Sequence, residues 1–307
     1  MTNFYGQYIG FGSGGAAAAF AGRGGTSLGW LVGGGPNGAQ HDRIESWSFT
    51  SDGDSTDVAN CYHARMGMAT TASATHCWHM GGYSGGNSNV IGTFAFVSTS
   101  NATDSGDLLG ARYSGVGNQS DTYGYNNGGW PPSNHIEKFA FASGGNTSDS
   151  GNMTITSGNR SGMSSETHGY CSGGNADVID KHSFASGGDA TDVGDGTVSS
   201  AAESGGGTMS GTHGYKHGGG WSPYSNIIEK FSFAADGNAT DVGDLDTASA
   251  SSSAGSSSQT YGYCAGGHVG GPVQNAIQKY SFAADGNASD VGDLQGTSAT
   301  THGSQSS

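Results

Sequence analysis

Charged residues are scarce in this chain, and the few that it has are mostly acidic. Of its 307 residues, 10 are Lys or Arg and 25 are Asp or Glu, so the formal net charge is −15 at pH 7. A chain of this charge repels the phosphates of nucleic acids. We therefore expect no nucleic-acid partner.

Cysteines and long apolar runs are also scarce. The four cysteines, at positions 61, 77, 171 and 264, have neither CxxC spacing nor the density of a disulfide framework, so we expect free, mostly buried thiols. No run of 18 apolar residues occurs, and Met1 is not followed by a charged and then a hydrophobic segment. We expect neither a membrane span nor a signal peptide.

Familiar catalytic motifs are missing as well. The chain has no Gly-x-Ser-x-Gly elbow, no phosphate-binding P-loop and no His-Glu-x-x-His. Its acidic residues recur too regularly to single out one general acid and one general base. The sequence therefore predicts a protein that is not an enzyme.

Glycine is abundant instead, with 59 residues, and it marks an internal repeat. Residues 214–245 return almost unchanged as residues 262–294, and looser copies precede them. Gly-Gly pairs 45 to 48 residues apart begin at Gly33, Gly81, Gly128, Gly173, Gly218 and Gly266. This period is typical of β-propeller blades, and aromatic residues placed at such a period argue against a disordered chain.

We therefore predict an all-β, six-bladed β-propeller over residues 21–307, preceded by an N-terminal extension of residues 1–20. Each unit is read as four short antiparallel strands. The first is predicted just before the Gly-Tyr pair, as at residues 119–123 and 258–261, and the second ends at Gly-Gly. In the third, Phe231 and Phe233 share one face because strand side chains alternate.

The end of the chain restarts the repeat. Residues 300–304 resemble the beginning of the unit at residues 212–215 and then stop. A strand of this kind can pair with the first blade, residues 21–60, and remove the open edges of the ring. We predict that the C-terminal strand closes the propeller.

The loops between Gly-Gly and the third strand vary most and carry Trp and Pro. Equivalent loops of a propeller gather on one face, so we predict a binding surface there. The candidate binding residues are Trp130, Trp221, Tyr224 and His268.

Two groups of repeated residues could hold a metal ion. Equivalent positions before the Gly-Tyr strand carry His76, His168, His213, His302, Tyr123 and Tyr261. A ring of imidazoles could bind a transition metal, but a hydrogen-bonded strand residue is the interpretation that we favour. The other group offers oxygen ligands for calcium, although tight turns use the same residue types and we favour that role. Its members are Asp236, Asn238, Asp241, Asp244, Asp285, Asn287, Asp290 and Asp293.

Basic residues also recur at fixed places in the repeat, where we predict structural pairing with the repeated acidic residues. They are Arg23, Arg65, Arg112, Arg160, Lys138, Lys181, Lys230 and Lys279.

The repeat resembles the kelch group of β-propellers. It shares a strand that ends in Gly-Gly, a strand with an aromatic pair, a fourth strand and an Arg-bearing link to the next unit. It departs from that group because Phe-Ser or Tyr-Ser stands in place of Tyr-Asp and the distal Trp is missing. The group includes a copper oxidase class, and the Cys, Tyr and His residues that its site needs cannot be placed on one face here. A kelch-like oxidase or hydrolase is therefore the third alternative.

The sequence of residues 228–245, preceded by Thr212-His213-Gly214-Tyr215, is similar to tandem repeats in virion proteins of tailed bacteriophages. This resemblance implies a capsid decoration, head-fibre or tail-associated protein that is made in the host cytoplasm and located in the virion. Residues 1–20 would contact other virion proteins, and a homo-oligomer is compatible with such a role. The alternative function is a glycan-binding propeller whose Trp and Tyr side chains stack on sugars, with a host-surface glycan as partner.

Overall fold

The computed structural model describes residues 27–35, 40–98, 100–198, 206–220, 224–246, 253–268, 272–299 and 302–306. The predicted extension, residues 1–20, and the first residues of the predicted propeller lie outside these ranges. All elements among the described residues are strands. They are β1 (Leu28–Gly34), β2 (His41–Ser48), β3 (Thr56–Asn60), β4 (Ala69–Ala72), β5 (His76–Met80), β6 (Ser88–Ala95), β7 (Thr103–Arg112), β8 (Val116–Gln119), β9 (Tyr123–Asn127), β10 (His135–Ala140), β11 (Gly144–Asn152), β12 (Arg160–Ser164), β13 (His168–Gly173), β14 (Val178–Ser183), β15 (Thr191–Asp195), β16 (Gly206–Met209), β17 (His213–His217), β18 (Ile227–Ser232), β19 (Thr240–Asp244), β20 (Ala254–Ser257), β21 (Tyr261–Ala265), β22 (Ala276–Ser281), β23 (Ser289–Asp293) and β24 (His302–Ser306).

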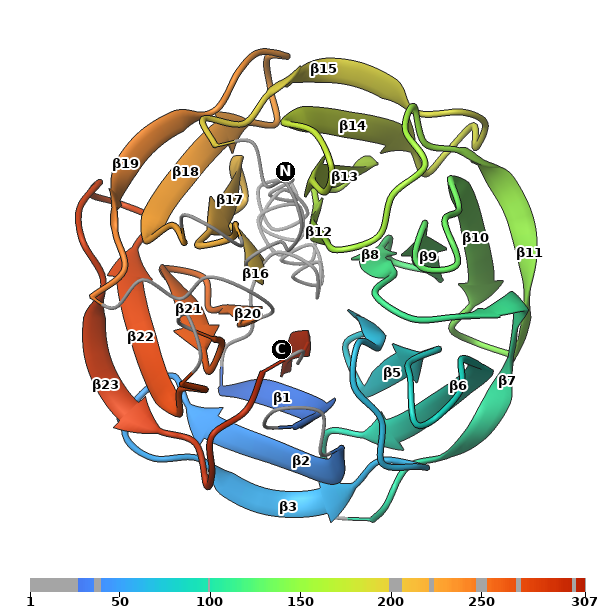
Figure 1. Ribbon diagram of the computed structural model, residues 1–307, viewed down its shortest axis with the longest axis horizontal. Helices are drawn as coiled ribbons and strands as arrows, with labels where there is room; N and C mark the ends of the chain where they lie inside the picture. The colour runs from blue at the N-terminus through green and yellow to red at the C-terminus, as the bar shows by residue number, and fades with distance from the viewer. Residues whose placement is uncertain are drawn as a thin grey trace, which may run out of the picture.

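These strands form six antiparallel sheets of four strands each, arranged around a common axis (Figure 1). The protein is a six-bladed β-propeller. Blade I contains β24, β1, β2 and β3, and blades II to VI follow in chain order as β4–β7, β8–β11, β12–β15, β16–β19 and β20–β23. The first strand of each blade lies nearest the axis and the fourth forms the rim.

The last strand closes the ring, as predicted. β24 pairs with β1 in antiparallel register from Leu28 opposite Ser306 to Val32 opposite His302. An isolated bridge between Gly35 and Ala299 continues this pairing. Blade I is therefore built from both ends of the described chain, which gives the inner edge of β1 a partner.

The predicted position of the first strands is wrong by about four residues. In blade VI the first strand is β20, whereas Ser258 and Tyr261 are joined by a turn hydrogen bond from the Ser258 amide to the Tyr261 carbonyl oxygen (2.8 Å). Each inner strand has a small residue at the position where neighbouring inner strands pack backbone against backbone. A Cβ atom would overlap the inner strand of the preceding blade at Gly117, Gly162, Gly207, Gly255 and Gly303. In blade II the equivalent residue is Thr70, whose hydroxyl donates to the Gly303 carbonyl oxygen (2.7 Å).

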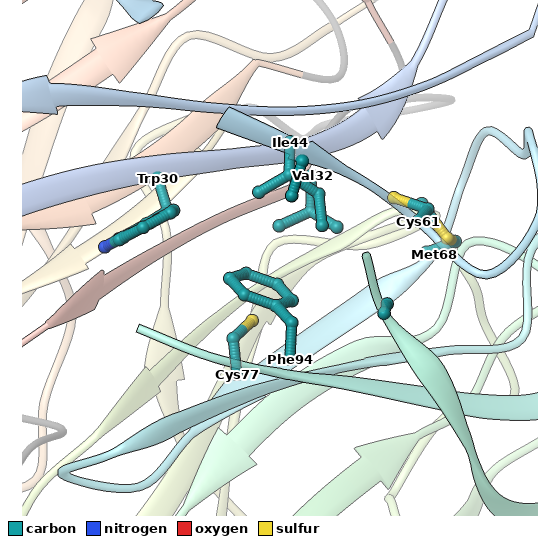
Figure 2. Packing of buried hydrophobic residues seen from close by; sticks show 9 residues of the cluster. Trp30, Val32, Ile44, Cys61, Met68, Cys77 and Phe94 are labelled. Carbon is teal, nitrogen blue, oxygen red and sulfur yellow. The ribbon is translucent and has the colours of Figure 1, made fainter. Parts of the chain in front are cut away.

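Six hydrophobic clusters fill the interfaces between adjacent blades. In the cluster between blades I and II, Trp30, Val32 and Ile44 face Phe94 and Cys77 of the next blade (Figure 2). At each interface an aromatic ring of a second strand also lies against the phenylalanine that directly follows the next blade's third strand, with centroids 4.6 to 5.3 Å apart. The pairs are Trp30–Phe96, Trp78–Phe141, Tyr125–Phe184, Tyr170–Phe233, Tyr215–Phe282 and Tyr263–Phe49. The four cysteines are buried thiols that form no disulfide, as predicted.

A buried polar side chain on each third strand, except in blade II, binds the chain that leaves the preceding blade, at the connector or, in blade III, at the end of β7. Glu229 of β18 accepts hydrogen bonds from the amide and hydroxyl of Thr197, both at 2.6 Å. In blade VI, Gln278 accepts from the Asp246 amide at 2.7 Å. The members of this set are Glu45, Glu137, Asp180, Glu229 and Gln278, all at most 2% exposed. They hold consecutive blades in register.

The cation that neutralises each buried carboxylate comes from a different place in every blade. Arg43 lies on the same strand as Glu45, and Arg112 reaches Glu137 from the end of β7 in the preceding blade. Arg160 on an inner strand pairs with Asp180, and Lys216 on a second strand pairs with Glu229 at 2.7 Å. The predicted structural pairing of Arg112 and Arg160 with acidic residues is confirmed. Arg112 pairs with Glu137, and Arg160 pairs with Asp180.

Replacing Lys216 by Cys should lower the free energy of unfolding by about 3–5 kcal/mol, because Glu229 would keep a buried charge without its cation. Blade VI supplies the matched control, since Cys264 and Gln278 occupy the same paired positions there. Adding Glu229→Gln to Lys216→Cys should recover most of the loss. Urea unfolding at pH 7 measures both variants, and equal stability of the single and double variants would contradict the pairing.

Candidate binding face

The loops and connectors of the propeller emerge on one face, which we call the loop face. It carries the segments that join second to third strands and those that join fourth strands to the next blade. The opposite face carries the turns between first and second strands and between third and fourth strands, and we call it the turn face. The Gly-Gly pairs lead the chain onto the loop face. Gly128 and Gly129, with φ of +61° and +109°, adopt a backbone conformation that other residues rarely take, and all six pairs share it.

Trp130 lies directly after its Gly-Gly pair on the loop face. Its amide donates to the Tyr113 carbonyl oxygen (2.8 Å) and its carbonyl accepts from the Tyr113 amide (2.9 Å). The indole packs against Gly158, where a Cβ atom would lie 2.5 Å from the indole Cδ1. Trp130 is therefore held in place at half exposure, with the exposed Pro131 beside it.

Tyr83 and Tyr113 extend Trp130 into a row of aromatic residues over blades II and III. Tyr83 follows Gly81-Gly82 as Trp130 follows Gly128-Gly129, and it pairs with Met66 through the same two backbone hydrogen bonds. The rings of Tyr83 and Tyr113 lie 5.6 Å apart at an angle of 56°. All three side chains are half-buried. We call Tyr83, Tyr113 and Trp130 the aromatic row.

Sequence reasoning missed two members of this row. Tyr83 occupies the same place in its repeat as Trp130, so the alignment of the repeats could have found it. Tyr113 lies in a connector, where no repeated residue type marks the position. Tyr62, which is 40% exposed, and His63 are neighbouring connector residues with rings 4.3 Å apart.

Two other predicted binding residues come together on blades V and VI. Tyr224 and His268 make an edge-to-face contact with centroids 6.0 Å apart, and both are half-buried. They belong to different blades from Trp130. Trp221 lies outside the described residues. The structure thus places the predicted residues in two groups on the loop face.

The calcium candidates lie at the turns and outer strands of blades V and VI, where they bind protein groups. Asp236 pairs with Lys181 (2.7 Å), and Asp285 pairs with Lys230 (2.6 Å). The side-chain oxygen of Asn238 accepts from the Asp195 amide (3.1 Å), and Asp241 accepts from the Gly243 amide (3.1 Å).

The second copy repeats this pattern. Asn287 accepts from the Asp244 amide (3.1 Å), and Asp290 accepts from the Gly292 amide (3.1 Å). The amide of Asp293 donates to Asp54 (3.0 Å). Lys279 pairs with Asp52 in the same way as the lysines of the two preceding blades. These contacts are those of turns and of ties between adjacent blades.

Three of the repeated histidines, His76, His168 and His213, lie at the starts of second strands on the turn face. The predicted equivalence of His302 is wrong, because His302 begins β24, the first strand of blade I. Nδ1 of His76, His168 and His213 lies 2.8 to 2.9 Å from the hydroxyl oxygen of the preceding threonine. Lys138 and Lys279 lie over the rings of Tyr123 and Tyr261 at the equivalent positions. Among the described residues, no three His, Cys, Asp or Glu side chains form a group that could hold a metal ion.

Comparison with known proteins does not assign the chain to a family. No protein-family model matches the chain, and no curated protein matches it. The described part of the chain contains no helix that could cross a membrane.

Proposed function

We propose that this protein is a non-enzymatic structural and binding module of a bacteriophage virion, where it acts as a capsid decoration, head-fibre or tail-associated protein. The closed ring would serve as a rigid support, and the aromatic row would make the contact. Residues 1–20 would attach the propeller to other virion proteins. The assignment to a virion rests on the similarity of the repeat to those of tailed-phage virion proteins.

The aromatic row is the observation that carries the binding role. Three aromatic side chains from two blades lie on the face where the loops differ, and backbone hydrogen bonds fix Tyr83 and Trp130 from both sides. Aromatic residues held in place lose little conformational entropy when they bind, which is why they are enriched in binding sites.

Labelled antibody against the protein, viewed by electron microscopy on native particles, tests the virion role. We expect label on capsids or tails, and a chain without residues 1–20 should lose this attachment while its propeller still folds. Label on free particles alone would refute the virion role.

A glycan-binding propeller is the second candidate, and the aromatic row favours it because such rings stack on the faces of sugars. Trp130→Ala should weaken glycan binding at least tenfold, which corresponds to about 1.4 kcal/mol. Tyr123→Ala is the matched control, since Tyr123 is 38% exposed but lies on the turn face. A glycan array probed with both variants decides the question, and equal binding by both would refute the row as a sugar site.

A further inference from the structure

Blade II lacks the buried acid on its third strand. In blade III, Glu137 lies opposite Asn126, and in blade II the same register places Gly92 opposite His79. The Glu137 carboxylate binds the Arg112 guanidinium (2.8 Å), the Leu109 amide (2.9 Å) and the Thr147 hydroxyl (2.7 Å). Gly92 offers none of these contacts.

The cation of blade II is nevertheless present. Arg65 takes the place of Arg112, and its Nη1 donates to the Gly81 carbonyl oxygen and the Ser88 hydroxyl, both at 2.6 Å. Arg112 makes the same two contacts with Gly128 and Ser133. Arg65 is only 2% exposed, and its Nε and Nη2 are buried without a hydrogen-bond partner. Within the described ranges it forms no ion pair.

The His79 side chain points towards Gly92, the residue that stands where blade III has its buried acid. Its ring lies where a side chain on Gly92 would begin, so that a Cβ atom there would overlap it. The imidazole is fully buried, and neither of its nitrogens has a hydrogen-bond partner. In blade V the residue at this position is Lys216, which pairs with the buried acid Glu229. Burial and the nearby Arg65 charge lower the pKa of His79 to about 3, so the imidazole is neutral. Nε and Nη2 of the Arg65 guanidinium and a neutral His79 N–H are therefore all without a partner where a carboxylate is missing.

We propose that blade II binds a small monovalent anion of chloride size between Arg65 and His79. An isolated buried charge is costly, and the anion would supply the negative charge that Glu137 supplies in blade III. Burial raises the pKa of the nearby Cys61 thiol, so this thiol stays neutral and gives no compensation. Asp104 is exposed, and its Oδ1 accepts from the Gly106 amide (3.0 Å). The site lies inside the protein and is independent of the binding face.

Thermal unfolding in increasing chloride tests the site. Potassium gluconate replaces the chloride to keep the ionic strength constant, because the gluconate anion is too large to enter the site. Saturating chloride should raise the unfolding temperature by roughly 3 °C or more, because a ligand that binds only the folded state stabilises it. The double variant His79→Asn/Gly92→Glu copies blade III and provides its own carboxylate. Its unfolding temperature should not depend on chloride.

A crystal grown in bromide locates the ion directly, and it needs no variant to fold. We expect an anomalous peak in contact with the Arg65 guanidinium and the His79 ring. The absence of that peak, or a peak without any stabilisation by chloride, would overturn the proposal. So would an equal chloride dependence in the double variant.

Discussion

A chain that ends at residue 299 should lose the closed ring and unfold at a much lower temperature. The deletion removes β24, so β1 loses five paired residues and the Thr70 hydroxyl loses its acceptor. At about 1 kcal/mol for each hydrogen bond, the free energy of unfolding should fall by roughly 5 kcal/mol. Thermal unfolding and size-exclusion chromatography measure the effect, since the free edge of β1 should also promote association.

A synthetic peptide of residues 300–307 provides the control for this deletion. Added to the truncated chain, it should pair with β1 and restore the unfolding temperature. A peptide with Gly303→Val should fail, because a Cβ atom at this position overlaps the backbone of Gly255. A truncated chain that stays monomeric and equally stable would show that the ring does not depend on its last strand.

Acidification from pH 7 to pH 5 should cost the protein about 4 kcal/mol of stability through two buried histidines. Burial lowers the pKa of His182 and His217 to about 3, against 6.5 for an exposed histidine. The unfolded chain therefore takes up protons below pH 6.5 while the folded protein does not. The stability that these residues lend is complete above pH 6.5 and falls as the pH drops towards 3.

Other blades supply the substitutions that test this dependence. Met80 of blade II stands where His217 stands in blade V, and Phe231 of blade V stands where His182 stands in blade IV. Urea unfolding between pH 7 and pH 5 should show a loss about 2 kcal/mol smaller in His217→Met or in His182→Phe than in the unchanged chain. His79 and His41, whose pKa values burial lowers to about 3 and about 4, keep their share of the loss in both variants. A loss that is unchanged in both variants would place the titrating groups elsewhere.

The parts of the fold that the sequence predicted are those that recur at fixed positions. The Gly-Gly pairs recur because their backbone conformation requires glycine, and Phe231 and Phe233 recur because both contact Tyr170 of the preceding blade. The pairing of Lys181, Lys230 and Lys279 with turn aspartates followed from the same regularity.

Features that change position from blade to blade escaped prediction. Inner strands such as β4 and β20 contain only Gly, Ala, Ser or Thr, and such runs look like loops until their close backbone packing is seen. The partner of each buried acid could not be read from the repeat, because Arg43, Arg112, Arg160 and Lys216 occupy four different positions. Tyr113 was missed for a similar reason, since only the fold brings its connector beside Tyr83.

The cation that pairs with the buried acid lies at a different position in each of four blades, and this affects how blades can be gained by gene duplication. In blades I, III, IV and V the cation and the acid lie in the same unit when the chain is divided just ahead of Arg112, the last residue of β7, and within the connectors elsewhere. A unit that is copied or transferred therefore carries its own counter-ion and leaves no buried charge behind. Gene duplication could then insert or exchange whole blades without matching substitutions in their neighbours, and each copy would be free to diverge on its own.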